Sequence, residues 1–95
     1  MSNTLYQSVS FQVSRLVTEK YSTSFSIASR MFAEDVRNAI YSIYGFVRIA
    51  DEIVDTFQGY DQRTLIDKFE SDCKEALYQG ISTNPILQSF SQTVS

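Results

Sequence analysis

The stretch from residue 33 to residue 56 constrains the fold of this chain more than any other part of it. Apolar residues recur there at helical spacing, and further apolar positions extend that surface around most of the predicted helix. A helix that is apolar over most of its circumference is normally buried. The 95 residues offer little else to bury it, so we expect them to be part of something larger. The apolar positions are Val36, Ile40, Ile43, Phe46, Val47, Ile49, Ala50, Ile53 and Val54.

The rest of the chain also has the pattern of helices, and the predicted fold class is all-α with about five helices. Glycine and proline, three and one in the whole chain, are too scarce for a turn-rich β fold. Residues that commonly cap helices stand at the predicted starts, and Gly80 stands where a C-terminal glycine is expected. The predicted helices cover residues 3–20, 25–32, 33–56, 62–79 and 85 onwards, with caps at Ser2 or Asn3, at Ser22, Thr23 or Ser24, at Asp61 and at Asn84.

Apolar periodicity also predicts which side of the other helices faces a core. The predicted inward positions are Leu5, Val9, Val13, Leu16 and Val17 in the first helix, Leu65, Ile66, Phe69, Cys73, Ala76 and Leu77 in the fourth, and Ile86, Leu87, Phe90 and Val94 in the fifth.

Composition excludes several classes of function. The net charge is −3, and Lys and Arg form no cluster of the kind that binds nucleic acid or anionic lipid. The absence of histidine removes His-dependent catalysis and histidine-containing zinc sites. Cys73 is the single cysteine, so no internal disulfide can form. Residues 1–10 lack the pattern of a signal peptide, and no apolar run reaches transmembrane length, so we expect a cytoplasmic protein.

Two acidic residues interrupt the apolar surface of the 33–56 helix. Asp51 and Asp55 are four residues apart and therefore stack on one face, and Tyr44 and Arg48 share with them a wedge of roughly 60°. Two carboxylates one turn apart suit Mg²⁺, which binds through a few carboxylates, waters and substrate phosphate. Arg48 could hold a phosphate oxygen. The alternative interpretation is a surface ladder of salt bridges joining Arg48, Asp51 and Asp55.

A second candidate site lies at Ser22, Thr23 and Ser24. Their hydroxyls and the free N–H groups of a helix start could bind a diphosphate. Simple capping of the helix is the alternative, and the sequence leaves both open.

Together, these two candidates resemble a pattern of the squalene/phytoene synthase family. In that family a Ser-x-Ser-Phe element precedes a long helix that ends in Arg-x-x-Asp-x-x-x-Asp. The resemblance is strong over residues 21–57 and weaker in the flanking helices. The motif DEIVD is closer to phytoene synthases than to eukaryotic squalene synthases. The matching residues are Ser22, Ser24 and Phe25, then Tyr44, Arg48, Asp51 and Asp55.

The resemblance implies a role for each of these residues. Asp51 and Asp55 would be the first aspartate-rich motif and would bind Mg²⁺, or Mn²⁺ in its place; no NADPH is predicted. The catalytic set would be Asp51, Asp55 and Tyr44, with Ser22, Ser24 and Arg48 on the substrate diphosphate and Phe25 lining the isoprenoid chain.

The implied reaction is a head-to-head condensation of two prenyl diphosphates in isoprenoid and carotenoid biosynthesis. One substrate loses diphosphate to give an allylic cation, and the double bond of the other attacks it to form a cyclopropyl intermediate. Geranylgeranyl diphosphate giving phytoene is the first expectation, and farnesyl diphosphate giving squalene or dehydrosqualene is the second. A lipid product would bring peripheral contact with a membrane, while no nucleic acid partner is expected.

The chain also departs from the family pattern. Family members are longer single all-helical domains with a second aspartate-rich motif downstream, and nothing after Asp72 resembles it. Residues 1–95 therefore correspond to the N-terminal portion of one such domain, which we expect to be inactive alone and to self-associate through exposed apolar faces. The rival hypothesis is a non-catalytic helical interaction module or oligomerising fragment.

Overall fold

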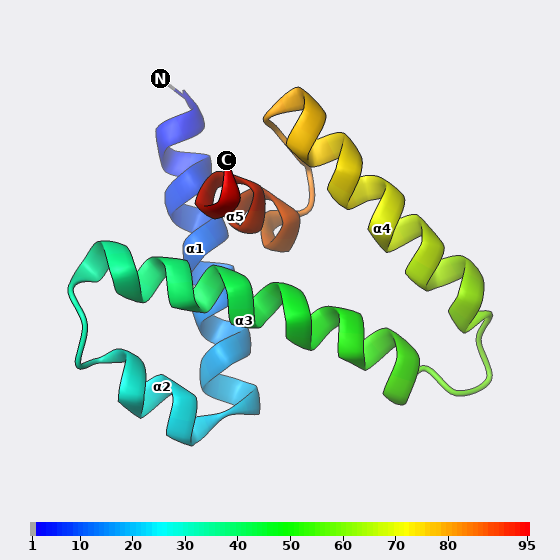
Figure 1. Cartoon of the computed structure of the whole chain (residues 1–95), viewed down its shortest axis with the longest axis horizontal. Helices are drawn as coiled ribbons and strands as arrows, with labels where there is room; N and C mark the ends of the chain where they lie inside the picture. Colours follow the sequence, from blue (N-terminus) through cyan, green and yellow to red (C-terminus); the bar gives the residue numbers. More distant parts are fainter. Residues whose placement is uncertain (1) are drawn as a thin grey trace.

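Two long helices that cross each other, α1 and α3, set the path of the chain (Figure 1). The computed structural model describes residues 2–95, which form five α-helices and no strand. The predicted all-α class is therefore confirmed. The helices are α1 (Ser2–Tyr21), α2 (Thr23–Ser29), α3 (Glu34–Asp55), α4 (Gln62–Gln79) and α5 (Pro85–Val94).

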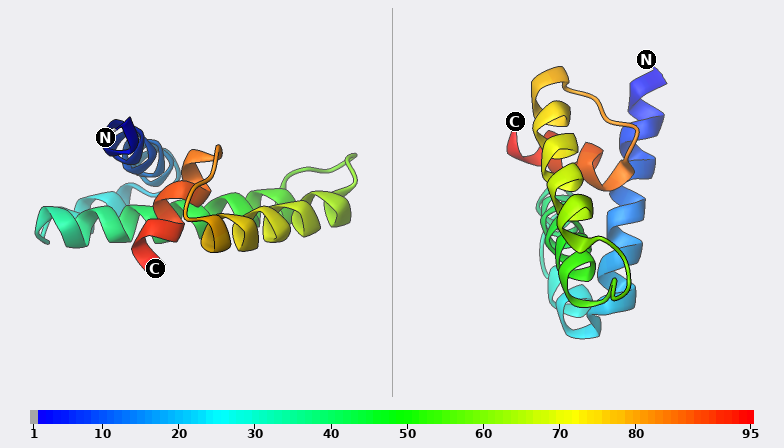
Figure 2. Two further views of the ribbon diagram at one scale, coloured as in Figure 1. Left: turned by 90° about the horizontal axis from the view of Figure 1, so that it is seen from above. Right: turned by 90° about the vertical axis from the view of Figure 1, so that its right-hand side faces the viewer.

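The helices are arranged as a thin slab rather than a bundle. α1 packs against α3 and α5, α4 turns back beside α3, and α5 fits into the angle between α1 and α4 (Figures 1 and 2). The short α2 packs on the end of α1. The molecule measures 39 × 33 × 18 Å. α5 is covered on nearly all sides, with Val94 its one exposed residue, whereas the other four helices each keep exposed residues along their length.

Local capping signals predicted most of the helix ends correctly. Asp61 accepts a hydrogen bond from the backbone N–H of Thr64 at 3.1 Å, and Asn84 accepts one from Ile86 at 3.0 Å. Gly80 ends α4 in the left-handed conformation with φ of 78°. Ser22 is the cap of α2.

The C-terminal end of α2 differs from the prediction. α2 ends at Ser29, three residues before the predicted end, because the backbone tightens there: Arg30 N–H donates to Ile27 and Met31 N–H donates to Ala28. The predicted cap of α1 at Ser2 or Asn3 lies outside the side chains that the structure describes.

The contact between α1, α3 and α5 is built from small residues. A Cβ atom added to Gly45 on α3 would lie 3.2 Å from Ser14 Cβ on α1 and 3.4 Å from Ile86 Cδ1 on α5. The hydroxyls bond to one another, with Ser14 Oγ 2.7 Å from Ser89 Oγ. This close approach buries polar side chains whose hydrogen bonds are satisfied. We call the region the helix junction and define it as Ser10, Ser14, Ser42, Gly45, Leu87 and Ser89.

The predicted inner face of α1 is only partly right. Val13 and Val17 pack against the core as predicted, but the helix junction buries a different set of α1 side chains. Leu5 and Leu16 are 73% and 53% exposed, whereas Ser10, Ser14 and Thr18 are fully buried. Apolar periodicity misses this face because Gly45 lets hydroxyl-bearing residues approach closely. Leu65, Leu77 and Val94, also predicted to point inward, are exposed too.

A compact apolar core lies where α3, α4 and α5 meet. Phe46 stacks between Phe69 and Phe90, with ring centroids 5.4 and 3.9 Å away. Cys73, predicted as a small core residue, is partly buried and packs against this core. The buried members around them are Ile53, Ala76, Ile86 and Leu87.

The opposite side of α3 stays open. Val36, Ile43, Val47 and Val54 share one side of the helix and are each between 44% and 49% exposed. We call these four residues the outer face. Among residues 2–95, no helix is both long and apolar enough to cross a membrane.

Candidate functional site

The two predicted metal-binding carboxylates lie near the C-terminal end of α3. Asp51 and Asp55 are both exposed. Neither side chain makes a hydrogen bond or an ion pair within the described residues 2–95. Both carboxylates are therefore available to a ligand from outside the chain.

Arg48, one turn before Asp51, is held by other residues. Its Nη2 donates to Glu52 Oε1 at 2.6 Å, and its Cζ lies 4.7 Å from the centre of the Tyr21 ring. The hydroxyl of Tyr21 donates to Glu52 Oε2 at 2.8 Å. We call Tyr21, Arg48 and Glu52 the Arg48 clamp.

The alternative prediction of a salt-bridge ladder through Arg48, Asp51 and Asp55 is wrong, since the ion pair of Arg48 is with Glu52. Arg48 pairs with Glu52 because Glu52 lies four residues after it, where helix side chains meet, and because Tyr21 fixes the second oxygen of Glu52.

The clamp changes the ionisation of its own members. The hydrogen bond from Arg48 lowers the pKa of Glu52, and the bond from Tyr21 lowers it further. The same contact with Glu52 raises the pKa of Arg48, and the hydrogen bond that Tyr21 donates to Glu52 raises the pKa of Tyr21. The site thus keeps one fixed cation beside two unengaged carboxylates.

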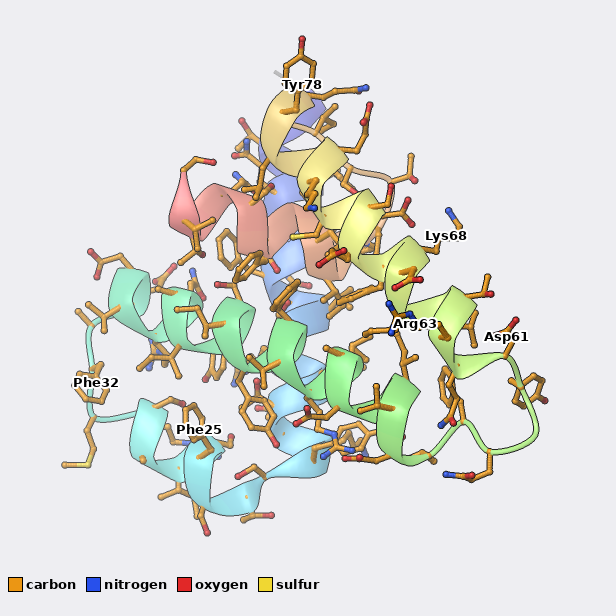
Figure 3. The ribbon with its side chains drawn as sticks, turned by 45° about the vertical axis from the view of Figure 1, so that its right-hand side comes forward. Phe25, Phe32, Asp61, Arg63, Lys68 and Tyr78 are labelled. Atoms are coloured by element: carbon orange, nitrogen blue, oxygen red, sulfur yellow. The ribbon has the colours of Figure 1, made fainter. Side chains whose placement is uncertain are left out.

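Phe25 and Tyr44 meet across the space between α2 and α3. Their ring centroids are 5.0 Å apart, and Figure 3 shows Phe25 on the side of α2 that faces α3. Phe25 remains 43% exposed. The pair forms an aromatic surface next to Arg48, which follows Tyr44 by one turn.

The serines of the predicted diphosphate element behave differently from each other. Ser22 Oγ accepts a hydrogen bond from the backbone N–H of Phe25 at 3.1 Å, so it caps α2. Ser24 is exposed, and its side chain makes no hydrogen bond within residues 2–95. Capping, one of the two alternatives, is therefore observed for Ser22, and it leaves the Ser24 hydroxyl available.

The carboxylates border the outer face directly. Asp51 lies four residues after Val47 and three before Val54, so all three side chains are neighbours on the helix surface. An apolar wall and a charged edge therefore run side by side along α3. This is the arrangement that a ligand with a charged head and an apolar tail would need.

The donor set fits a shared Mg²⁺ site better than a complete one. Two unengaged carboxylates at i and i+4 match the preference of Mg²⁺ for a few carboxylates together with waters and substrate phosphate. Within the part of the chain that the structure describes, no group of three or more acidic or sulfur ligands comes together. Asp51 and Asp55 would therefore supply only part of a coordination sphere.

Sequence reasoning missed two members of this region. Glu52 could have been found, because a Glu four residues after an Arg is a standard helix pair. Tyr21 could not, since it is 31 residues away from Glu52 and only the crossing of α1 and α3 brings it there.

One shallow hollow borders the second candidate site, where Thr23 lines it, and another lies away from the candidate residues. A hollow of about 460 Å³ between α1 and α3 is lined by Arg15, Arg37 and Tyr41 among others. It contains none of the predicted site residues, because the candidate site is a flat edge and not a closed pocket.

The geometry defines a helical protein that presents paired carboxylates and an anchored arginine beside an apolar wall. The family described as squalene/phytoene synthase matches residues 18–95, most of the chain. The chain therefore belongs to the squalene/phytoene synthase family. The match includes every residue of the candidate site, from Ser22 to Asp55.

One curated relative supports the same family. The 4,4'-diapophytoene synthase of Staphylococcus haemolyticus (strain JCSC1435) is 33% identical over 73 residues, which cover 77% of this chain. The match spans 25% of the length of that relative. No solved structure gave a significant match to the chain.

Proposed function

We propose that the protein to which this chain belongs condenses two prenyl diphosphates head to head, in isoprenoid or carotenoid biosynthesis. The observation that carries the proposal is the charged edge of α3, where Asp51 and Asp55 are unengaged and lie beside the exposed apolar outer face. Membership of the squalene/phytoene synthase family supports the same reaction class.

The chain's own residues divide into a polar and an apolar group. Arg48 and the hydroxyls of Ser22 and Ser24 would contact the substrate diphosphate, because guanidinium and hydroxyl donors suit phosphate oxygens. Phe25 would line the isoprenoid chain, and Tyr44 would stand between the two groups as part of the catalytic set. The 5.0 Å contact between Phe25 and Tyr44 keeps that apolar surface continuous with Arg48.

Asp51 and Asp55 would hold Mg²⁺, with Mn²⁺ as a substitute. When bound, the metal would supply charge stabilisation for the departing diphosphate. The pair provides part of a coordination sphere, so we propose that further ligands come from the substrate and from other parts of the full protein. For the same reason we propose that residues 1–95 alone do not turn over substrate.

The substrate is proposed at the level of chemical class. The residues of the aspartate motif favour geranylgeranyl diphosphate as the substrate, giving phytoene, with farnesyl diphosphate as the second candidate. The similarity to a 4,4'-diapophytoene synthase supports the second expectation, because 4,4'-diapophytoene is another name for dehydrosqualene. Each candidate substrate has the same diphosphate head, which is the part that α3 would recognise.

Binding of farnesyl diphosphate by the 95-residue chain, with and without Mg²⁺, tests the proposal by calorimetry. We expect Mg²⁺ to strengthen binding, and we expect the pair of changes Asp51→Asn and Asp55→Asn to remove that strengthening. Asp67→Asn with Glu70→Gln is the control, because it also removes two negative charges from exposed positions, here on α4, where the two residues pair with Arg63 and Lys74. Equal loss in both variants would show a general charge effect and would refute the metal site.

A helical interaction module remains the second candidate, and the open outer face favours it. We propose that residues 1–95 associate with a second copy through Val36, Ile43, Val47 and Val54, since exposed apolar patches of this kind mark association sites. A binding module has no use for Asp51 and Asp55. Mg²⁺-independent behaviour combined with tight self-association would therefore favour this candidate.

A further inference from the structure

The Arg48 clamp joins two helices that are distant in the sequence. Tyr21 comes from the last turn of α1, while Arg48 and Glu52 come from α3. Within the clamp, the side chains of Arg48 and Glu52 are only 26% and 17% exposed. Such a pair is less screened by solvent than a fully exposed surface salt bridge.

Both oxygens of the Glu52 carboxylate are engaged. Oε1 accepts from Arg48 at 2.6 Å and from the hydroxyl of Thr56 at 3.1 Å, and Oε2 accepts from Tyr21 at 2.8 Å. Glu52 therefore differs from its neighbours Asp51 and Asp55, whose oxygens are unengaged within residues 2–95. Its position between two candidate metal ligands does not make it a third.

Two contacts hold the guanidinium of Arg48, and they leave some of its N–H donors without a hydrogen-bond partner. Glu52 takes Nη2 at one edge, and the Tyr21 ring lies 4.7 Å from Cζ. The Nε–H is buried and has no hydrogen-bond partner in the described part of the chain, so the donors open to a ligand are those of Nη1, which makes no hydrogen bond there. A free arginine side chain has many rotamers, and fixing one of them in advance lowers the cost of binding a ligand.

We propose that Glu52 and Tyr21 are positioning residues, which fix the Arg48 guanidinium so that its remaining donors meet the diphosphate of the substrate. This inference rests on the proposed function, because it assigns Arg48 a diphosphate ligand. It goes beyond it by giving a role to two residues that do not touch the substrate.

The negative charge of Glu52 makes the proposal testable, because charge and positioning predict opposite effects. Glu52 lies beside the proposed anion site, so its charge alone would repel a diphosphate. If Glu52 were a bystander, any neutral replacement would strengthen binding. If Glu52 positions Arg48, a replacement that cannot accept the hydrogen bonds must weaken binding.

The first measurement needs no ligand. The Nε–Hε signal of Arg48 in the 95-residue chain, followed by ¹⁵N relaxation, reports how firmly the guanidinium is held. We expect it to be rigid in the wild type and in Glu52→Gln, which keeps an acceptor oxygen. In Glu52→Ala it should become as mobile as Arg30, an exposed arginine at the end of α2 whose side chain makes no hydrogen bond or ion pair within residues 2–95. If the Arg48 side chain stays rigid in Glu52→Ala, Glu52 does not position it, and the proposal is wrong.

The second measurement is the affinity for inorganic diphosphate in the presence of Mg²⁺. We expect Glu52→Ala to weaken binding about 3- to 10-fold, the effect of one arginine losing its preorganisation. Glu52→Gln should bind at least as tightly as the wild type. Tyr21→Phe, which keeps the ring but loses the bond to Glu52, should weaken binding about 2-fold or less.

Three results would contradict the positioning role. Tighter binding by Glu52→Ala would show a bystander charge, and equal weakening in Glu52→Ala and Glu52→Gln would show a general loss of structure, which circular dichroism would confirm. A wild type that binds no diphosphate while Arg48 stays rigid would refute the proposed function and the role of the clamp in binding, leaving the clamp as a purely structural contact.

Discussion

The helix junction and the outer face occupy opposite sides of α3, and they use their residue types in opposite ways. The helix junction is built largely from serines and one glycine, yet Ser14, Ser42 and Ser89 are fully buried there. The outer face is built from valine and isoleucine, yet its members are 44% to 49% exposed.

The difference teaches that burial in this chain follows geometry before hydrophobicity. At Gly45 the helices approach closely enough for hydroxyls to satisfy one another, as in the 2.7 Å contact between Ser14 and Ser89. The outer face is open because α1, α4 and α5 all pack on other sides of α3. One side of α3 thus stabilises the chain, and the other side is available for ligand or partner.

The largest loss of stability should come from truncating a leucine at the helix junction, with an exposed leucine outside it as the control. Leu87 at the helix junction is fully buried, whereas Leu16 on α1 is 53% exposed. Leu87→Ala should lower the free energy of unfolding by about 3 kcal/mol through lost burial and a cavity, and Leu16→Ala by less than about 0.5 kcal/mol. Urea unfolding measures both, and equal losses would mean that the junction is not the stabilising side.

Overpacking the close approach at Gly45 should come next. Gly45→Val adds atoms where even a Cβ would lie 3.2 Å from Ser14. We expect a loss of about 2 kcal/mol, less the small gain in helix propensity. Ile43→Val on the outer face, 46% exposed, is the control and should be nearly neutral. A stabilised Gly45→Val would show that the helices can move apart freely.

The hydroxyl pair at the helix junction should show a smaller, coupled effect. A double-mutant cycle of Ser14→Ala and Ser89→Ala isolates the 2.7 Å contact between their Oγ atoms. We expect a coupling energy of about 1 kcal/mol, since each single change leaves a buried hydroxyl with one partner fewer. Strictly additive losses in thermal unfolding would deny the pair any role of its own.

A charge on the outer face should affect stability least. Val47→Lys replaces a 48% exposed residue, so the free energy of unfolding should change by less than about 0.5 kcal/mol. Its effect should appear in association instead, because a charge disrupts an apolar contact between copies. Sedimentation should show a shift toward monomer. A wild type that is already monomeric at high concentration would contradict the proposed self-association.

Local chemistry made the helices predictable from the sequence. Asp61, Gly80 and Asn84 act on backbone groups within a few residues of themselves, so their effects can be read without knowledge of the fold. The spacing of Asp51 and Asp55 on one face of α3 is local in the same sense. These features required only the geometry of a single helix.

Contacts between helices account for the rest. Burial of Ser10 and exposure of Leu5 depend on where α1 crosses α3, and the partner of Arg48 depends on Tyr21 arriving from α1. The apolar periodicity of a sequence does not indicate where two helices will cross. It therefore predicted the extent of α3, and on α1 it identified Val13 and Val17 but missed the buried serines.

The central claim is that the charged edge of α3 is a divalent-cation site, and paramagnetic broadening by Mn²⁺ tests it most directly. In ¹H–¹⁵N spectra of the 95-residue chain, trace Mn²⁺ should broaden the amides of residues 51–55 first and spread toward Arg48. The acidic residues Asp67 and Glu70 on α4 should respond weakly. Broadening centred on α4, or spread evenly over all acidic residues, would contradict the account.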